Sequence, residues 1–401
     1  MRVCVLGAGI VGLATAYELN LAGHDVTVID RALPGSGASG GNGSQLSYSY
    51  VQPLADPGIW AQLPKLLLSP TSPLKFRPQL DVHQWRWGLQ FLAACNAGAS
   101  RSATIALLKL AAESRRGFDA MLNKEKLAVD FSDTGKLVLF STGASFAAAQ
   151  KQMLLQRELG SVQEAVSADQ CVAIEPALAS YQQCITGAIY TPSECAADCQ
   201  KTCDGLLVLL AQRGIRFLLD TPVEQIHMKA AAVVAIKTPH AEIEADRYVM
   251  ALGAASAPMA RQLGVDLPIY PLKGYSITVD VGDVSKAPAV SVTDSTRKVV
   301  FARIGSRLRV AGMAEMVGYD TQVDIRQINS LMASTQALFP TCSQFAELNP
   351  WAGLRPATPS GLPLVGRHAK GPSNMLFNVG HGALGFTLAF GSAARVAELL
   401  D

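Results

Sequence analysis

The stretch Arg2-Val-Cys-Val-Leu-Gly-Ala-Gly-Ile-Val-Gly12 decides the fold of this chain. Its first five residues have the apolar and β-branched character of a short buried strand, and Ile10 to Ala22 has the spacing of a helix. Asp25 to Ile29 (Asp-Val-Thr-Val-Ile) is a second buried strand. A strand, a helix and a second strand of these lengths form one βαβ unit with parallel strands. We therefore predict an α/β fold with a doubly wound, Rossmann-type sheet.

The turn between the first strand and the helix carries a G-x-G-x-x-G motif. Gly7 permits a tight turn, Gly9 lets the backbone approach a pyrophosphate, and Gly12 lets the helix pack closely on the strand. The start of the helix also offers unpaired N–H groups to phosphate oxygens. Asp30 ends the second strand, where a carboxylate accepts hydrogen bonds from ribose hydroxyls and disfavours a 2′-phosphate. The pattern predicts a site for FAD or NAD rather than NADP.

A second glycine-rich loop follows, Gly35-Ser-Gly-Ala-Ser-Gly-Gly-Asn-Gly-Ser-Gln45. Its five glycines are more than an NAD site requires, and they would let the chain run close to an extended cofactor. Ser39, Asn42 and Ser44 offer hydrogen bonds. A flexible linker is the alternative interpretation, although Asn42 and Gln45 are unusual in a bare spacer. The loop favours FAD.

Three late segments also favour FAD. Residues 246–256 are a strand that opens into small residues, as expected where a chain passes beneath bound adenosine. Residues 351–366 place one arginine, Arg355, among apolar and turn residues. Residues 378–387 open a helix whose first N–H groups would face the flavin N1 and C2 carbonyl and stabilise the reduced ring.

The middle of the chain predicts a second structural unit. Alternating segments at 275–279, 298–302 and 307–311 are typical of antiparallel strands with one solvated face. We expect a discontinuous FAD-binding domain and an antiparallel substrate-binding or cap domain. The expected ranges are 1–50, 170–255 and 345–401 for the first, and 51–169 and 256–344 for the second.

Composition narrows the class of protein. The chain has 401 residues, 49% of them apolar, and a formal net charge of +2, which gives no reason to expect nucleic acid as a partner. Eight cysteines are too few for a disulfide scaffold, so a reducing compartment is expected. The charge-free run 371–394 contains Pro372 and five glycines, which argues against a membrane span. We expect a cytoplasmic protein, either free or peripheral on the inner face of the cell membrane.

Taken together, these motifs resemble the D-amino-acid-oxidase-like flavoenzyme superfamily, and most closely its bacterial D-amino acid dehydrogenases. The resemblance runs nearly end to end and includes Tyr270-Pro-Leu-Lys-Gly-Tyr-Ser276, Gly312-Met-Ala-Glu315, Gly353-Leu-Arg-Pro-Ala-Thr-Pro359 and Gly380-His-Gly-Ala-Leu-Gly385. It implies non-covalent FAD, since the cysteine motif that tethers the flavin of methylated-amine oxidases is absent. The cofactor contacts expected on the motifs and the resemblance are Gly7, Gly9, Ile10, Val11, Gly12, Asp30, Arg31, Ser39, Asn42, Gly43, Ser44, Gln45, Val223, Leu252, Gly253, Gly380, His381, Gly382, Leu384, Gly385, Phe386 and Thr387.

The resemblance also implies a reaction: an α-amino acid gives its Cα hydrogen as hydride to flavin N5, and water hydrolyses the imino acid to a 2-oxo acid and ammonia. Arg355 is the candidate for the substrate carboxylate, because a guanidinium makes two parallel bonds to it. Tyr275, Tyr319 and Tyr50 are candidates for hydroxyl contacts or aromatic walls. His381 is a candidate through its ring or only its backbone. No general base is expected if the amine arrives neutral.

Two further sequence patterns have both a functional and a purely structural interpretation. Cys195, Cys199 and Cys203 recur every four residues, which suits a small buried helix face better than a metal site, so no metal is expected. Segment 56–95 gathers tryptophans, leucines and basic residues. This segment fits a membrane- or partner-facing surface, where a quinone collects electrons, and fits a packed lid equally well.

Four functions stay open. The first is an FAD-dependent D-amino acid dehydrogenase that passes electrons to a quinone or another membrane acceptor. The second is an oxidase of glycine, sarcosine or a cyclic amino acid that reduces oxygen. The third is a catalytic subunit of a larger dehydrogenase complex or oligomer. The fourth is a non-catalytic flavin-binding protein, which the arginine motif argues against.

Overall fold

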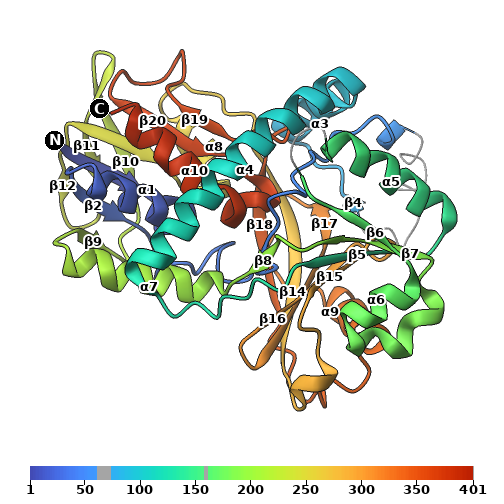
Figure 1. Cartoon of the computed structure of the whole chain (residues 1–401). Helices are drawn as coiled ribbons and strands as arrows, with labels where there is room; N and C mark the ends of the chain where they lie inside the picture. Colours follow the sequence, from blue (N-terminus) through green and yellow to red (C-terminus); the bar gives the residue numbers. More distant parts are fainter. Residues whose placement is uncertain (61–73, 158–160, 401) are drawn as a thin grey trace.

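The computed structural model describes residues 1–60, 74–157 and 161–400 (Figure 1). A six-stranded sheet in the order β19-β20-β13-β1-β2-β9 takes strands from both ends of the chain. All neighbours pair in parallel except β19 and β20. The strands are β1 (Arg2–Leu6), β2 (Asp25–Ile29), β9 (Arg216–Leu218), β13 (Arg247–Met250), β19 (Leu364–Gly366) and β20 (Met375–Val379). The predicted βαβ unit is confirmed, with helix α1 (Ile10–Leu21) between β1 and β2.

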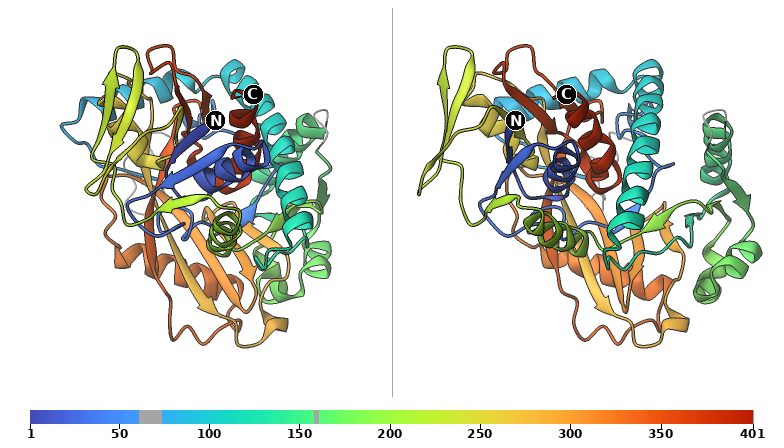
Figure 2. Two further views of the ribbon diagram at one scale, coloured as in Figure 1. Left: turned by 90° about the vertical axis from the view of Figure 1, so that its left-hand side faces the viewer. Right: turned by 60° about the vertical axis from the view of Figure 1, so that its left-hand side comes forward.

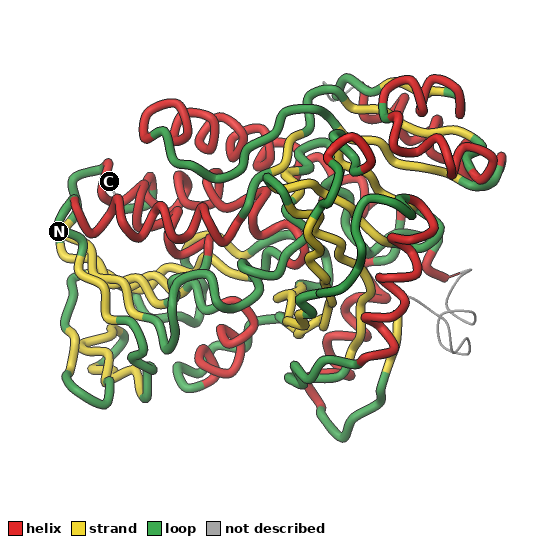
Figure 3. Tube along the Cα trace, turned by 90° about the horizontal axis from the view of Figure 1, so that it is seen from below, coloured by secondary structure: helices red, strands yellow, loops and turns green. Residues whose placement is uncertain are grey.

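Four helices share one apolar core on this sheet: α1, α4 (Ala97–Glu125), α7 (Cys199–Gln212) and α10 (Gly385–Glu398). Helices α4 and α10 lie side by side (Figures 1 and 2). A Cβ atom at Gly391 would come within 2.6 Å of the Leu110 carbonyl oxygen, so the two backbones touch where glycine allows it. The N- and C-termini lie close together in every view (Figure 3).

A nine-stranded sheet forms the second unit, in the order β18-β14-β17-β16-β15-β5-β7-β6, with β4 pairing β17. Its pairs are antiparallel apart from β15–β5 and β17–β4. The strands are β4 (Leu74–Phe76), β5 (Lys136–Phe140), β6 (Glu164–Val166), β7 (Gly187–Thr191), β14 (Tyr270–Asp280), β15 (Ser291–Asp294), β16 (Val299–Ile304), β17 (Arg307–Met316) and β18 (Trp351–Ala357).

The prediction of one solvated face is wrong for β14, which lies next to the terminal strand β18 and is buried along its whole length except at Asp280. One face of β14 meets the glycine-rich loop, through Ser276 and Gly41, and helix α9 (Ile325–Leu338) packs against the strand on the other. Alternating hydrophobicity does not predict exposure in β14, because the face expected to meet solvent is covered by another part of the same chain.

The remaining elements complete the two units. They are β3 (Gln45–Leu46), β8 (Cys195–Ala196), β10 (Gln225–Lys229), β11 (Ala232–Lys237), β12 (Glu242–Ile243), α3 (Val82–Ala94), α5 (Gly143–Arg157), α6 (Ala168–Ile174), α8 (Ser256–Arg261), and the 3-10 turns η1 (Pro176–Cys184), η2 (Gly253–Ala255), η3 (Val284–Lys286) and η4 (Gly382–Leu384). Helices α5 and α6 stand at the opposite end of the molecule from the N-terminus (Figure 2).

The expected domain ranges agree with the sheets only in part. Strands β7 and β18 fall inside ranges expected for FAD binding, yet they pair in the nine-stranded sheet. Helix α4 falls inside a range expected for the cap, yet it packs on the core beneath the six-stranded sheet. We therefore propose the division between two units by sheet rather than by those boundaries.

The cysteine stripe is also different from its expectation. Cys195 lies in strand β8, and only Cys199 and Cys203 lie on α7, because the helix begins after Asp198, whose side chain accepts the N–H groups of Gln200 and Lys201. All three cysteines are buried. Within the described ranges, no group of three or more His, Cys, Asp or Glu side chains has the arrangement of a metal site.

Candidate functional site

The fingerprint turn is built so that only glycine fits. Gly7 has φ +112°, and a Cβ atom there would lie 2.4 Å from the Ala251 carbonyl oxygen at the end of β13. A Cβ atom at Gly12 would lie 1.9 Å from the Gly7 carbonyl oxygen. The first turn of α1 is therefore pressed against the carboxyl ends of β1 and β13, which is where parallel sheets bind nucleotides.

Asp30 lies at the edge of this turn. Its Oδ2 accepts the Ala8 N–H at 2.6 Å, and its Oδ1 accepts the Ala32 N–H at 3.1 Å. Burial raises the pKa of the Asp30 carboxyl. Asp30 thus shapes the glycine turn as well as standing where a ribose is expected, whereas the neighbouring Arg31 is exposed.

Helix starts reveal where an anion or a polar group fits. Helices α3, α4, α6, α7 and α9 each begin with a side chain that accepts a backbone N–H of the first turn. In the described part of the chain, α1, α8, α10 and the turns η2 and η4 begin without such a cap. These starts follow Gly9, Leu252 and the Gly380–Gly385 motif, the positions expected to hold pyrophosphate, adenosine and flavin. FAD therefore fits these residues, because it offers acceptors for first-turn N–H groups that no N-cap side chain satisfies; at α1 the Ile10 N–H is already bonded, by Ser39 of the glycine-rich loop.

The glycine-rich loop joins the fingerprint to the large sheet. Ser39 Oγ accepts the Ile10 N–H at 3.0 Å, which places the loop directly at the start of α1. Asn42 Oδ1 accepts the Ser44 N–H at 2.8 Å, and Ser44 has a left-handed φ of +55°. Gln45 Nε2 donates to the Val292 and Phe301 carbonyls. Ser39 therefore joins the expected cofactor cradle, whereas the side chains of Asn42 and Gln45 hold the loop in place.

Arg309 on β17 also holds this loop, and the sequence reasoning missed it. Its Nη1 donates to the Gly40 carbonyl at 2.9 Å and to the Asn42 carbonyl at 3.0 Å. Ser276 Oγ donates to the Gly41 carbonyl between them at 2.8 Å. Burial lowers the pKa of Arg309. A basic residue in the middle of a buried strand was the available indication of such a role.

Arg355 lies on β18, half-buried, beside this loop. Its Nη1 donates to the Met313 carbonyl at 2.6 Å, and burial lowers its pKa to about 10. Across the described ranges, no carboxylate lies within 4.0 Å of the guanidinium. Trp351, on the same face of β18, has its ring over Gly41, where a Cβ atom would come within 2.0 Å of it. The structure therefore places a positive charge without a carboxylate partner on the same face of β18 as Trp351, whose ring lies over the glycine-rich loop.

The structure does not bring Tyr275 together with Arg355. Adjacent Gly274 faces the guanidinium, so Tyr275 points to the other face of β14. There its hydroxyl donates to Glu315 Oε2 at 2.7 Å. Burial and this carboxylate raise the pKa of Tyr275. Tyr319 is 47% exposed, and its hydroxyl donates to the Ala254 carbonyl at 3.3 Å, next to Gly253.

The other two candidates have protein partners. The Tyr50 hydroxyl bonds the Thr191 hydroxyl at 2.7 Å. His381 Nε2 lies 3.0 Å from Ser392 Oγ inside α10, while its backbone bridges to Ala357 at the end of β18. Burial lowers the pKa of His381 to about 4, so the ring is neutral at physiological pH. The His381 ring is therefore bonded within the protein, and its backbone belongs to the glycine motif expected to face the flavin.

Lys136 is a second residue that no motif in the sequence indicates. Its Nζ donates to Ser47 Oγ at 2.8 Å and lies 4.6 Å from the centre of the Tyr50 ring. The Ser47 N–H donates to Thr387 Oγ1 in the first turn of α10 at 3.3 Å. Burial lowers the pKa of Lys136 to about 8. A buried amine therefore lies two contacts away from the helix start expected to face the flavin.

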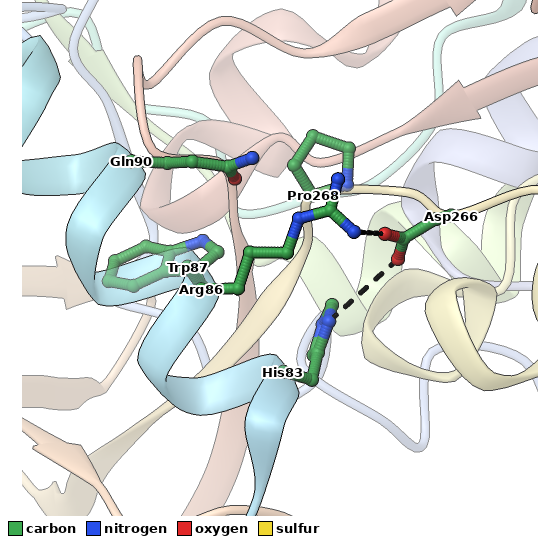
Figure 4. A pocket seen from close by; sticks show the side chains of 6 residues that line it. All are labelled: His83, Arg86, Trp87, Gln90, Asp266 and Pro268. Atoms are coloured by element: carbon green, nitrogen blue, oxygen red, sulfur yellow. Dashed lines mark hydrogen bonds and ion pairs between the residues drawn. The ribbon is translucent and has the colours of Figure 1, made fainter.

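A small surface pocket marks the junction of α3 with the large sheet (Figure 4). Arg86 pairs with Asp266 there, and His83 Nε2 lies 2.8 Å from the Ile269 carbonyl oxygen. Trp87 Nε1 donates to the Ala357 carbonyl at 2.8 Å, two residues beyond Arg355. These contacts fix α3 over the end of β18.

Along the described residues, no helix is long and apolar enough to cross a membrane.

Comparisons with known proteins agree with this geometry. The chain is 46% identical to D-amino acid dehydrogenase 2 of Ralstonia nicotianae, covering 100% of this chain and 96% of the relative. It is 44% identical to D-amino acid dehydrogenase 2 of Pseudomonas aeruginosa, covering 99% and 94%. Among solved structures, glycine oxidase from Bacillus cereus has a TM-score of 0.76 at 20% identity, covering 100% of this chain and 94% of that one. L-proline dehydrogenase from P. horikoshii has a TM-score of 0.77 at 18% identity, covering 100% and 92%.

The two structural likenesses show the fold, which confirms the α/β FAD-binding architecture expected from the sequence. A family model described as FAD dependent oxidoreductase, DAO, matches residues 2–399. That match spans both sheets and every motif of the site, so the chain belongs to the DAO family of FAD-dependent oxidoreductases.

Proposed function

We propose that this protein is an FAD-dependent D-amino acid dehydrogenase. The proposal is supported by relatives that carry this name at 35–46% identity over nearly their whole length. The observation that carries it in the structure is Arg355, a buried guanidinium whose hydrogen-bond partners are neutral carbonyl groups of β17. Such a group suits a substrate with one carboxylate.

The residues of the site would act by binding and orientation. Arg355 would hold the substrate carboxylate through two parallel N–H···O bonds, which fixes the direction of the Cα–H bond. Trp351 and the loop at 40–43 would close the side of the site and exclude water. When bound, FAD supplies the acceptor for the hydride that leaves Cα. Hydrolysis of the resulting imino acid then gives a 2-oxo acid and ammonia.

The proposed electron acceptor is a membrane quinone, reached from the cytoplasmic side. Val82, Trp85 and Leu89 follow helical spacing along α3 and are 82%, 51% and 69% exposed. Arg86, which is paired with Asp266, lies at the edge of this face. Aromatic, aliphatic and basic residues on one helix face are typical of a surface that rests in a membrane interface. Residues 61–73 of the expected membrane- or partner-facing segment 56–95 lie outside the described residues.

The decisive experiment is Arg355→Lys in the FAD-loaded enzyme. Lysine keeps the charge but loses the planar two-point contact, and hydride transfer tolerates little misalignment. We expect kcat/KM for D-amino acids to fall roughly 10²-fold, about 2.7 kcal/mol of transition-state stabilisation, with FAD content unchanged. Near-normal turnover would mean that the carboxylate is bound elsewhere.

A second measurement tests the reaction class. An anaerobic screen of amino acid enantiomers should bleach the flavin absorbance with D-amino acids and not with their L-forms. Dye or quinone reduction that clearly exceeds hydrogen peroxide formation in air supports a dehydrogenase, and the reverse indicates an oxidase.

A further inference from the structure

The direction of the Arg355 side chain is set by its neighbours on two other strands. Arg355 lies on the terminal strand of the sheet path, and its guanidinium extends across β14 towards β17. It crosses at Gly274, the cross-strand partner of Gly353. A Cβ atom at Gly274 would lie 2.4 Å from Nη2 and 2.5 Å from Cζ of Arg355.

The glycine at 274 is needed for space and not for backbone conformation. Gly274 has no positive φ, so an L-residue is compatible with its backbone. Gly353 on the paired strand likewise leaves its place to the Trp351 ring. The Trp351 ring thus occupies the space over Gly353, and the Arg355 guanidinium occupies the space over Gly274.

The far end of the guanidinium meets an irregularity in β17. Lys273 pairs with Glu315, whereas Tyr275 pairs with Gly312, so β17 contains one residue more than β14 over this stretch. Within this bulge, Met313 has a left-handed φ of +59°. The bulge takes carbonyl groups out of the regular ladder, and Arg355 donates to Met313 O at 2.6 Å, with Gly312 O at 3.5 Å from Nη2.

We propose that Gly274 and the Met313 bulge are positioning elements that hold the Arg355 guanidinium at the height and angle the substrate carboxylate requires. This inference rests on the proposed role of Arg355. Neutral carbonyl partners fix the side chain without neutralising its charge, which keeps its attraction for an anion. A carboxylate partner would fix the side chain equally well but would compete with the substrate.

The first test is Gly274→Ala in the FAD-loaded enzyme, with pyruvate as a carboxylate probe and the flavin absorbance change as the signal. The added methyl group must displace the guanidinium, so we expect the Kd of pyruvate to rise at least 10-fold. The KM for D-alanine should rise with it, and FAD content should stay unchanged. The control is Gly282→Ala just beyond β14, where a Cβ atom meets open space and the backbone is also unconstrained. An unchanged Kd in Gly274→Ala would overturn the inference.

A double-mutant cycle separates this inference from the proposed function. If Gly274 acts through Arg355, adding Gly274→Ala to Arg355→Ala should change the Kd of pyruvate less than 2-fold. An undiminished effect in that background would overturn the positioning role and leave the proposed function intact. If Arg355→Ala alone leaves pyruvate binding unchanged, the carboxylate anchor itself is wrong, and the inference falls with it.

The bulge provides an independent pair of variants. Glycine adopts a left-handed φ without strain, whereas a β-branched residue does so only at a high cost. Met313→Gly should therefore retain the Kd of pyruvate within about 3-fold, and Met313→Val should raise it about 10-fold. Both variants lose packing of the half-buried Met313 side chain, so a merely structural role would affect them alike, and an equal Kd in the two would contradict the inference.

Discussion

Asp30 has both a structural role and a predicted binding role. Its carboxylate accepts two backbone N–H groups of the fingerprint turn, and it stands where a ribose is expected. Asp30→Ala should weaken FAD binding by about 1.5–3 kcal/mol, since it removes a charged acceptor and leaves the Ala8 N–H unpaired. FAD titration of the apoprotein measures this. Asp25→Ala, at the exposed start of β2, is the matched control. If the Asp30→Ala and Asp25→Ala variants bind FAD with the same affinity, Asp30 does not contact the ribose.

The buried charge of Lys136, near α10, lowers the free energy of unfolding at neutral pH. Its pKa falls from 10.5 to about 8, which corresponds to about 3 kcal/mol of unfavourable burial at pH 7. Lys136→Met should therefore raise the free energy of unfolding at pH 7 by about 1–3 kcal/mol, after loss of the Ser47 contact. Urea unfolding provides the measurement.

The pH dependence of that difference has a definite sign. Between pH 8 and pH 10.5 the unfolded chain still binds the lysine proton and the folded protein does not, so the stability of the unmodified protein rises with pH. The advantage of Lys136→Met should shrink over this range. Lys151→Met, at an exposed position on α5, is the control variant. A pH-independent difference for Lys136→Met would contradict a buried, titrating amine.

Among the elements, three helices start earlier or later than their sequence pattern indicates. Hydrophobic periodicity alone predicts helices from Trp85, Ile105 and Ala196, whereas α3, α4 and α7 begin at Val82, Ala97 and Cys199. Each true start follows an Asp or Asn cap, at 81, 96 and 198. Capping residues therefore carried the missing information, because they satisfy N–H groups that periodicity ignores.

The sequence predicted the site residues that lie close together in one segment, but not the contacts that depend on how distant strands pair. The fingerprint glycines, Asp30 and Ser39 lie within one continuous segment, and their geometry agrees with the motif. Arg309 reaches the loop from a strand more than 260 residues away. The face to which Tyr275 points depends on strand register, which a single sequence does not reveal.

Helix α3 supports a prediction of its own. If its exposed face rests on a membrane, Trp85→Ser with Leu89→Ser should reduce binding to anionic phospholipid vesicles at least 10-fold, since each side chain contributes about 1.5–3 kcal/mol when buried. Dye-linked turnover of D-amino acids should be unaffected. Val208→Ser, an isolated exposed residue on α7, is the control. Unchanged vesicle binding in the double variant would remove α3 from the membrane contact.

For the whole molecule, FAD is expected to act as a non-covalent link between the two sheets. Arg309 and Ser276 of the large sheet hold the same loop that Ser39 ties to α1. Acid should release FAD from the polypeptide. Saturating FAD should also raise the melting temperature of the apoprotein, because FAD at 100 times its Kd adds about 2.7 kcal/mol to the free energy of unfolding. FMN, which lacks the adenosine half, should raise it less. Flavin retained by the denatured chain would contradict non-covalent binding.

The order of strands in the six-stranded sheet has a consequence for biosynthesis. Strand β1 pairs with β13, and β13 pairs with β20, so residues at opposite ends of the sequence complete one surface. A ribosome makes the fingerprint turn first, and α10 emerges only after more than 380 residues have been translated. The edge of β1 that pairs with β13 therefore stays uncovered for more than 200 residues of synthesis, and the cofactor site is complete only after α10 has emerged.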